Sequence, residues 1–151
     1  MSAALKYIYM EDFAPGQKYT AGPVTITEEE IIAYGKQFDP QDFHTDPVRA
    51  KDTVVGELIA SGWHTAGLTM RMIFDAFPQM KGGMIGRSVE KVEWPRPVRP
   101  GDRLFLDCEI LDVRASKSNP QRGIIRVKCL TLNQRRETAM TMETVIFVPR
   151  K

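Results

Sequence analysis

Alternating apolar and polar positions dominate the second half of the chain and predict β-strands. The longest alternation runs over residues 103–113, where Leu104, Leu106, Cys108 and Ile110 share one face. Similar strand patterns cover four further segments: 18–27, 86–94, 123–132 and 138–148. Short polar turns at 116–120 and 133–137 join consecutive segments, so we expect one antiparallel sheet of about five strands.

Helical spacing appears twice before the strand-rich half. Thr27 followed by three glutamates predicts a capped helix that ends between Gly35 and Phe38. Residues 61–77 predict a longer helix, apolar on more than one face and therefore largely buried, with Met70 and Phe74 included. Between the two, residues 39–47 contain two prolines and three aspartates, which predict an ordered loop, followed by a short helix over 47–51.

These elements predict an α+β architecture in which one antiparallel sheet lies against one buried helix. No internal repeat or low-complexity linker divides the chain, so residues 1–151 are expected to form a single domain. One helix covers only one face of such a sheet. The other face and the edge strands then invite pairing with a second copy, and we expect a homodimer.

Composition narrows the functional classes. Twenty-one Lys and Arg against 19 Asp and Glu leave a net charge of +2, which argues against nucleic acid as a partner. No apolar run is long enough to span a membrane, and the first residues do not resemble a signal peptide. Both cysteines, Cys108 and Cys129, lie inside predicted strands, as expected of buried thiols in a cytoplasmic protein.

The predicted loop places Asp39 close in sequence to His44. A carboxylate and an imidazole held together are what general acid–base chemistry on water requires. An Asp-Pro turn and a lone histidine in a surface loop give the alternative, purely structural interpretation. Asp42, His44 and Asp46 are residue types that bind metals. Because the sequence has no second cluster of such residues, they predict no metal site.

The start of the long helix is the second candidate. Unpaired N–H groups at a helix N-terminus stabilise negative charge, and Gly62 permits a ligand to approach them closely. Alternatively, Ser61 is an ordinary N-cap and Gly62 a packing glycine, while Trp63 and His64 are packing residues. The sequence contains no phosphate-binding glycine loop, serine nucleophile elbow or zinc-protease motif.

In their order along the chain, three segments resemble one family. The segment DPQDFH (39–44) is similar to a motif of Asp, any residue, Asn, Pro, an aliphatic residue and His, and Ser61-Gly62 stands where that motif's family has His-Gly. The turn WPRPVRPGD (94–102) matches a third family feature. The chain thus resembles the MaoC-like (R)-specific enoyl-CoA hydratases and dehydratases, whose hot-dog fold wraps a sheet around a central helix.

The resemblance implies an acyl-CoA thioester substrate, no metal or cofactor, and hydration of a trans-2-enoyl thioester or the reverse dehydration. Asp39 and His44 would activate water, and the Gly62 N–H would bind the thioester oxygen beside Ser61, Trp63 and His64. Gln41, Asp42 and Ser61 depart from the family pattern. A hot-dog acyl-CoA thioesterase and a non-catalytic acyl-binding subunit are the alternatives.

Overall fold

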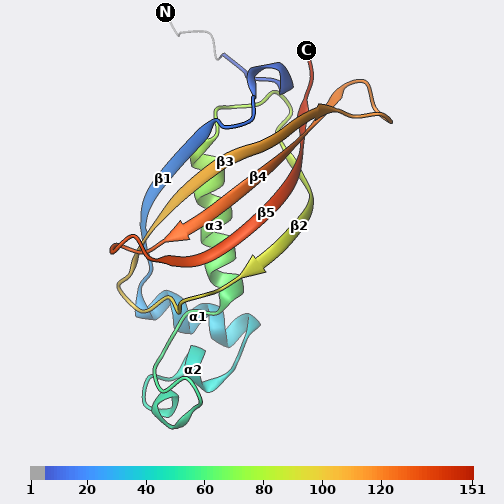
Figure 1. Cartoon of the computed structure of the whole chain (residues 1–151). Helices are drawn as coiled ribbons and strands as arrows, with labels where there is room; N and C mark the ends of the chain where they lie inside the picture. The colour runs from blue at the N-terminus through green and yellow to red at the C-terminus, as the bar shows by residue number, and fades with distance from the viewer. Residues whose placement is uncertain (1–5) are drawn as a thin grey trace, which may run out of the picture.

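The computed structural model describes residues 6–151, and its strands form one antiparallel sheet (Figure 1). The strand order is β1-β3-β4-β5-β2. The strands are β1 (Lys18–Thr25), β2 (Ile85–Glu93), β3 (Arg103–Ala115), β4 (Arg122–Leu132) and β5 (Thr138–Pro149). Each of the five predicted strands is present with ends shifted by one or two residues. The hot-dog arrangement expected from the resemblance is confirmed.

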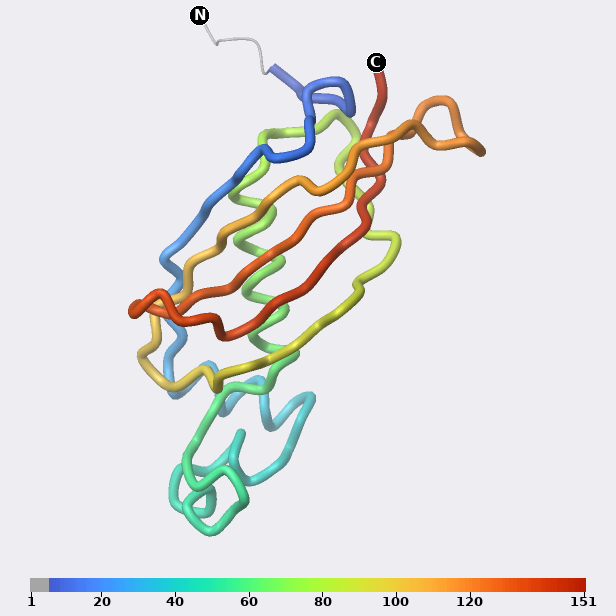
Figure 2. Tube along the Cα trace, in the orientation of Figure 1, coloured from blue at the N-terminus to red at the C-terminus, as the bar shows by residue number. Residues whose placement is uncertain are grey.

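Helix α3 (Gly62–Ala76) lies along the concave face of the sheet, which curves around it (Figures 1 and 2). Its buried side chains pack against alternate residues of β3, β4 and β5. Thr69 adds a polar link, since its hydroxyl lies 2.9 Å from the Thr65 carbonyl oxygen and 2.6 Å from the Thr131 hydroxyl on β4. The core between helix and sheet includes Met72, Ile73, Leu106, Ile110, Val127, Cys129 and Met140.

One expectation about α3 is wrong. Trp63, Met70 and Phe74 are 63%, 48% and 61% exposed, although we expected this helix to be buried on more than one face. These residues follow the i, i+7, i+11 spacing of a single helical stripe, and the sheet covers the opposite side of the helix. We call these three residues the α3 stripe.

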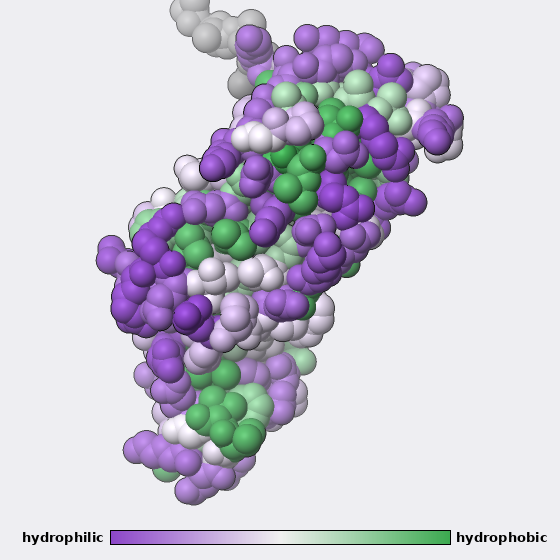
Figure 3. All heavy atoms as spheres, viewed as in Figure 1, coloured by the Kyte–Doolittle hydropathy of each residue, from purple (hydrophilic) through white to green (hydrophobic). Residues whose placement is uncertain are grey.

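The outer face of the sheet also differs from expectation. It is largely hydrophilic (Figure 3) and carries cross-strand ion pairs, such as Arg126 to Glu90 at 2.6 Å and Lys91 to Glu143 at 3.3 Å. Charged pairs on neighbouring strands are stable in water. This face therefore has no need of a partner, and the uncovered apolar surface lies on α3 and on the edge strand β2 instead.

The segment between β1 and α3 forms a small helical cap at one end of the sheet (Figure 1). It contains α1 (Glu28–Phe38), α2 (Asp42–Thr45) and the 3-10 helix η2 (Arg49–Asp52); another 3-10 helix, η1 (Met10–Asp12), precedes β1. The Thr27 hydroxyl accepts the Glu30 N–H at 3.1 Å and caps α1 as predicted. No helix among residues 6–151 is long and apolar enough to cross a membrane.

The segment 39–47 is more regular than predicted. Asp39 ends α1, and Pro40, which has no N–H, prevents the helix from continuing. The chain then makes one turn of helix, α2, in which the Thr45 hydroxyl donates to the Gln41 carbonyl at 3.0 Å. The predicted helix over 47–51 is the 3-10 turn η2, displaced by one to two residues.

Candidate functional site

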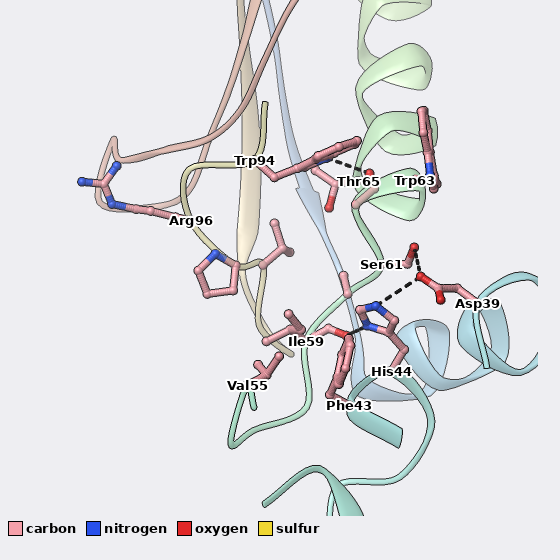
Figure 4. A pocket seen from close by; sticks show the side chains of 14 residues that line it. Asp39, Phe43, His44, Val55, Ile59, Ser61, Trp63, Thr65, Trp94 and Arg96 are labelled. Atoms are coloured by element: carbon pink, nitrogen blue, oxygen red, sulfur yellow. Dashed lines mark hydrogen bonds and ion pairs between the residues drawn. The ribbon is translucent and has the colours of Figure 1, made fainter. Parts of the chain in front are cut away.

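The ends of α1 and α2 bring Asp39 and His44 together. Asp39 is the C-terminal cap of α1, and its own N–H donates to the Gly35 carbonyl at 2.9 Å. The turn of α2 reverses the chain, so that His44 Nε2 lies 3.2 Å from Asp39 Oδ2 (Figure 4). The two residues that sequence spacing paired are thus in direct contact.

A glycine permits the close packing that places His44. Gly35 is buried on α1, and a Cβ atom built on it would collide with the carbonyl oxygen of His44. The neighbouring atom belongs to the backbone and cannot rotate away. Only glycine therefore allows α1 to lie this close to α2.

Two fixed contacts hold the His44 ring. His44 is 5% exposed, and its Nδ1 lies 2.7 Å from the carbonyl oxygen of Ile59. Because a carbonyl oxygen only accepts, Nδ1 must carry a hydrogen. The other ring nitrogen, Nε2, faces Asp39.

Three groups surround the Asp39 carboxylate. The Ser61 hydroxyl donates to Oδ2 at 2.9 Å, and His44 faces the same oxygen (Figure 4). The Gln41 side-chain amide donates to Oδ1 at 2.8 Å. Burial on its own raises the pKa of Asp39, but the hydrogen bonds from Gln41 and Ser61 and the charge of His44 outweigh it and lower the pKa below its ordinary value. The site therefore stabilises the ionised carboxylate.

Ser61 explains part of the departure from the family motif. It occupies the N-cap position of α3, yet its hydroxyl makes no capping bond to the helix and instead donates to Asp39. Gln41 supplies its amide to the same carboxylate. Asp42, by contrast, points toward Arg49 at the exposed surface, 4.0 Å away, and takes no part in the cluster.

The start of α3 presents unpaired amides to this cluster. The Ser61 carbonyl accepts the N–H groups of His64 and Thr65, whereas the N–H groups of Gly62 and Trp63 have no acceptor within residues 6–151. No acidic residue lies in the first turn of α3. The positive end of the helix dipole is therefore available to an incoming negative charge.

A cavity of about 480 Å³ joins these features (Figure 4). Asp39, His44, Ser61 and Gly62 line one side, and most of the remaining wall is apolar. The apolar part consists of Phe43, Val55, Ile59, Ala60, Trp63, Trp94, Pro97 and Val98. Such a mixture of a few convergent polar groups in an apolar cavity is typical of a small-molecule site.

His64 and Trp94 are placed differently from the sequence analysis. His64 does not line the cavity; its ring stacks on Tyr34 of α1 with centroids 4.7 Å apart. Burial lowers the pKa of His64, against a smaller opposite effect of Glu30. Trp94, which the sequence analysis did not select as a site residue, contacts Gly62. The one available signal was its position at the start of the 94–102 turn.

The comparison with protein families decides the membership of the chain. The model of the MaoC-like domain matches residues 12–131, which include every polar residue of the cavity described above. The chain belongs to the MaoC-like domain family. This membership supports a hydratase or dehydratase role.

Relatives of this MaoC-like protein share its fold over nearly the whole chain. The structure of a MaoC-like dehydratase from Rhodospirillum rubrum is 36% identical, with a TM-score of 0.88 over 95% of this chain and 98% of that one. The unliganded (R)-hydratase PhaJ1 from Pseudomonas aeruginosa is 25% identical, with a TM-score of 0.77 over 96% and 88%. An uncharacterized protein from Bacillus subtilis, YdeM, is 24% identical over 93% of this chain and 99% of its own.

Proposed function

We propose that this MaoC-like protein catalyses the reversible hydration of a trans-2-enoyl thioester to the (R)-3-hydroxyacyl thioester. The observation that carries the proposal is the 3.2 Å contact between Asp39 and His44, set in the cavity beside the unpaired amides of α3. This arrangement offers a proton-transfer pair for water and a separate site for negative charge. Addition of water to a conjugated thioester needs both.

The reaction begins with a water molecule in the cavity that contacts both Asp39 and His44. As the water oxygen bonds to C3 of the enoyl group, one of its protons passes to the pair, and the electron pair of the C2–C3 double bond moves toward the thioester oxygen. The resulting enolate then takes a proton at C2 from the same pair. Both additions occur on the face of the double bond that the pair occupies, which accounts for a single stereochemical product.

The start of α3 stabilises the enolate. The Gly62 N–H donates to the thioester oxygen, and the helix dipole favours the negative charge that develops there. The ionised Asp39 is compatible with this charge because Ser61, Gln41 and His44 already satisfy its oxygens. The acyl chain occupies the apolar wall formed by residues such as Phe43, Ile59 and Trp63.

The homodimer belongs to the same proposal. The α3 stripe is exposed beside the cavity, and Trp63 belongs both to the stripe and to the cavity wall. Edge strand β2 adds the exposed side chains of Ile85 and Val89. A second copy that covers the stripe buries apolar area and encloses the open side of the acyl site.

Turnover of crotonyl-CoA tests the function. We expect loss of the absorbance of the conjugated enoyl thioester without release of free thiol, and formation of the (R)-3-hydroxyacyl product. Asp39→Ala and His44→Ala should each lower kcat by about 10²- to 10⁴-fold, the usual contribution of general acid–base catalysis. Full activity in both variants would disprove the mechanism, and Ser118→Ala, in an exposed turn, serves as the control.

Thioester hydrolysis is the second candidate. The Asp39 carboxylate lies 2.9 Å from the hydroxyl of Ser61 at the start of α3, and a hot-dog thioesterase needs a carboxylate near this helix. Release of thiol from saturated acyl-CoA by the wild-type protein would favour that reaction. Binding of acyl-CoA without turnover at any chain length would instead favour a non-catalytic acyl-binding subunit.

A further inference from the structure

The indole of Trp94 lies flat against the first residue of α3. A Cβ atom built on Gly62 would lie 2.6 Å from Trp94 Cε2 and 2.8 Å from Nε1, closer than any side chain tolerates. The glycine at this position is therefore required by the tryptophan, independently of any ligand. This contact joins the end of β2 to the start of α3, across 32 residues of sequence.

A hydrogen bond fixes the orientation of the same peptide group. Trp94 Nε1–H donates to the Gly62 carbonyl oxygen at 3.0 Å. That carbonyl shares a planar peptide unit with the N–H of Trp63, one of the two unpaired amides that face the cavity. A donor on the carbonyl oxygen polarises the unit and strengthens the N–H at its other end.

Two further contacts connect the segments on either side of Trp94. Trp63 packs edge-on against Trp94, with ring centroids 5.3 Å apart and planes at 76°. The Ala60 N–H donates to the Val98 carbonyl at 2.9 Å, which ties the chain before α3 to the segment after Trp94. Figure 4 shows Trp94 between the helix start and the segment that leads to Arg96.

We propose that Trp94 is a positioning residue that holds the Gly62–Trp63 peptide so that the Trp63 N–H donates to the developing enolate oxygen together with the Gly62 N–H. The inference rests on the proposed hydration activity. It adds a second donor, the Trp63 N–H, and a side chain that does not itself touch the reacting atoms. Its effect appears in the transition state that leads to the enolate, because negative charge develops on the thioester oxygen only as water adds.

Trp94→Phe keeps an aromatic ring over Gly62 and removes the hydrogen bond. We expect kcat for crotonyl-CoA to fall about tenfold, with KM changed less than about twofold, the pattern of an interaction lost in the transition state. Tyr9→Phe, at the N-cap of η1 and outside the cavity lining, provides an aromatic control and should leave both constants unchanged.

A stability cycle tests the contact without enzyme turnover. Gly62→Ala should lower Tm by at least about 3 °C in the wild-type background, since the new methyl group must displace the indole. In the Trp94→Ala background the same substitution should cost nothing, because the space is open. Equal costs in both backgrounds would show that Trp94 does not determine the glycine, and would overturn the inference.

Intrinsic fluorescence provides a further signature. The chain contains two tryptophans, Trp63 and Trp94, and both line the cavity. In Trp63→Phe, all tryptophan emission comes from Trp94, and it should change when saturated butyryl-CoA binds without reacting. If the Trp94 emission does not change at a saturating concentration of butyryl-CoA, the thioester does not bind beside Trp94 and the inference is overturned.

The failure of each proposal has its own signature. No hydration by the wild-type protein removes the proposed function and this inference with it. Normal hydration by the wild-type protein, together with an unchanged kcat in Trp94→Phe, removes this inference alone.

Discussion

Replacement of Ser61 by alanine isolates the hydrogen bond that keeps Asp39 ionised. Ser61 is 1% exposed, and its hydroxyl donates to Asp39 Oδ2, the oxygen that also faces His44. The hydroxyl makes no capping bond to α3, so the substitution removes no helix cap. The folded state should therefore tolerate Ser61→Ala, and its effect should appear in the chemistry of Asp39.

The size of the effect follows from the surroundings of the carboxylate. A hydrogen bond to a charged group contributes about 1.5–3 kcal/mol, and about 1.4 kcal/mol corresponds to a factor of ten. Asp39 keeps Gln41 and His44 after the substitution, and its side chain is 26% exposed, so water replaces part of the lost bond. We expect the low end of the range, about a tenfold loss of kcat/KM in solution more acidic than the ordinary pKa of an aspartate.

The sign of the pH dependence is fixed by the form that Ser61 stabilises. Its hydroxyl donates to the ionised carboxylate and contributes to the lowered pKa of Asp39, so Ser61→Ala raises that pKa toward the ordinary value. The acidic limb of kcat/KM against pH then moves to higher pH. Above neutral pH, where Asp39 is ionised in both proteins, the two activities should converge.

Crotonyl-CoA hydration between about pH 3 and 8.5, a range that extends below the ordinary pKa of an aspartate, measures this shift, with Tm recorded at each pH. Ser61→Thr retains a hydroxyl and should restore the wild-type acidic limb, while Ser118→Ala controls for loss of a serine at an exposed turn. An acidic limb that stays in place in Ser61→Ala, in a protein of unchanged Tm, would refute the role given to this hydrogen bond.

Three further substitutions test other parts of the structure. Gly35→Ala should destabilise the fold by about 1–3 kcal/mol in urea unfolding and lower kcat, because its methyl group collides with the His44 backbone; a neutral effect would contradict this packing. Burial lowers the pKa of His64 in the folded protein, whereas the unfolded chain takes up a proton at about pH 6.5, the ordinary value. The wild type should therefore lose stability as the pH falls below about 6.5, and His64→Phe should lose less. Identical pH slopes of Tm in the two proteins would contradict this effect of His64. Phe74→Lys should convert a dimer to monomer in light scattering, whereas Val54→Lys, at a 96% exposed position, should not.

The alternation of apolar and polar residues predicted the sheet well because its strands have one solvent-exposed and one buried face. Alternation over β3 placed Leu104 and Ile110 in the core, and both are fully buried. The same reasoning failed for Met70 and Phe74, since an apolar residue on a helix can face the core or an uncovered surface equally well. The alternation could not predict the strand order, because β2 pairs with β5 and β1 with β3 across long stretches of chain.

In the candidate site, too, some contacts could be predicted from the sequence and others could not. The proximity of Asp39 and His44 was predictable because only four residues, one of them a proline, lie between them. The hydrogen bond from Ser61 to Asp39 was not, since a serine before a helix normally caps it. The contact of Trp94 with Gly62 depends on the pairing of β2 beside β5, which carries the end of β2 to the start of α3.

Ile59 has two separate roles, one for its main chain and one for its side chain. Its main-chain carbonyl anchors His44, while its side chain forms part of the cavity wall. Every residue type supplies the same carbonyl, so the side chain at position 59 is free to vary in size without disturbing the imidazole. Under the proposed function, a change of the side chain at position 59 would alter the acyl preference and leave the proton-transfer pair in place.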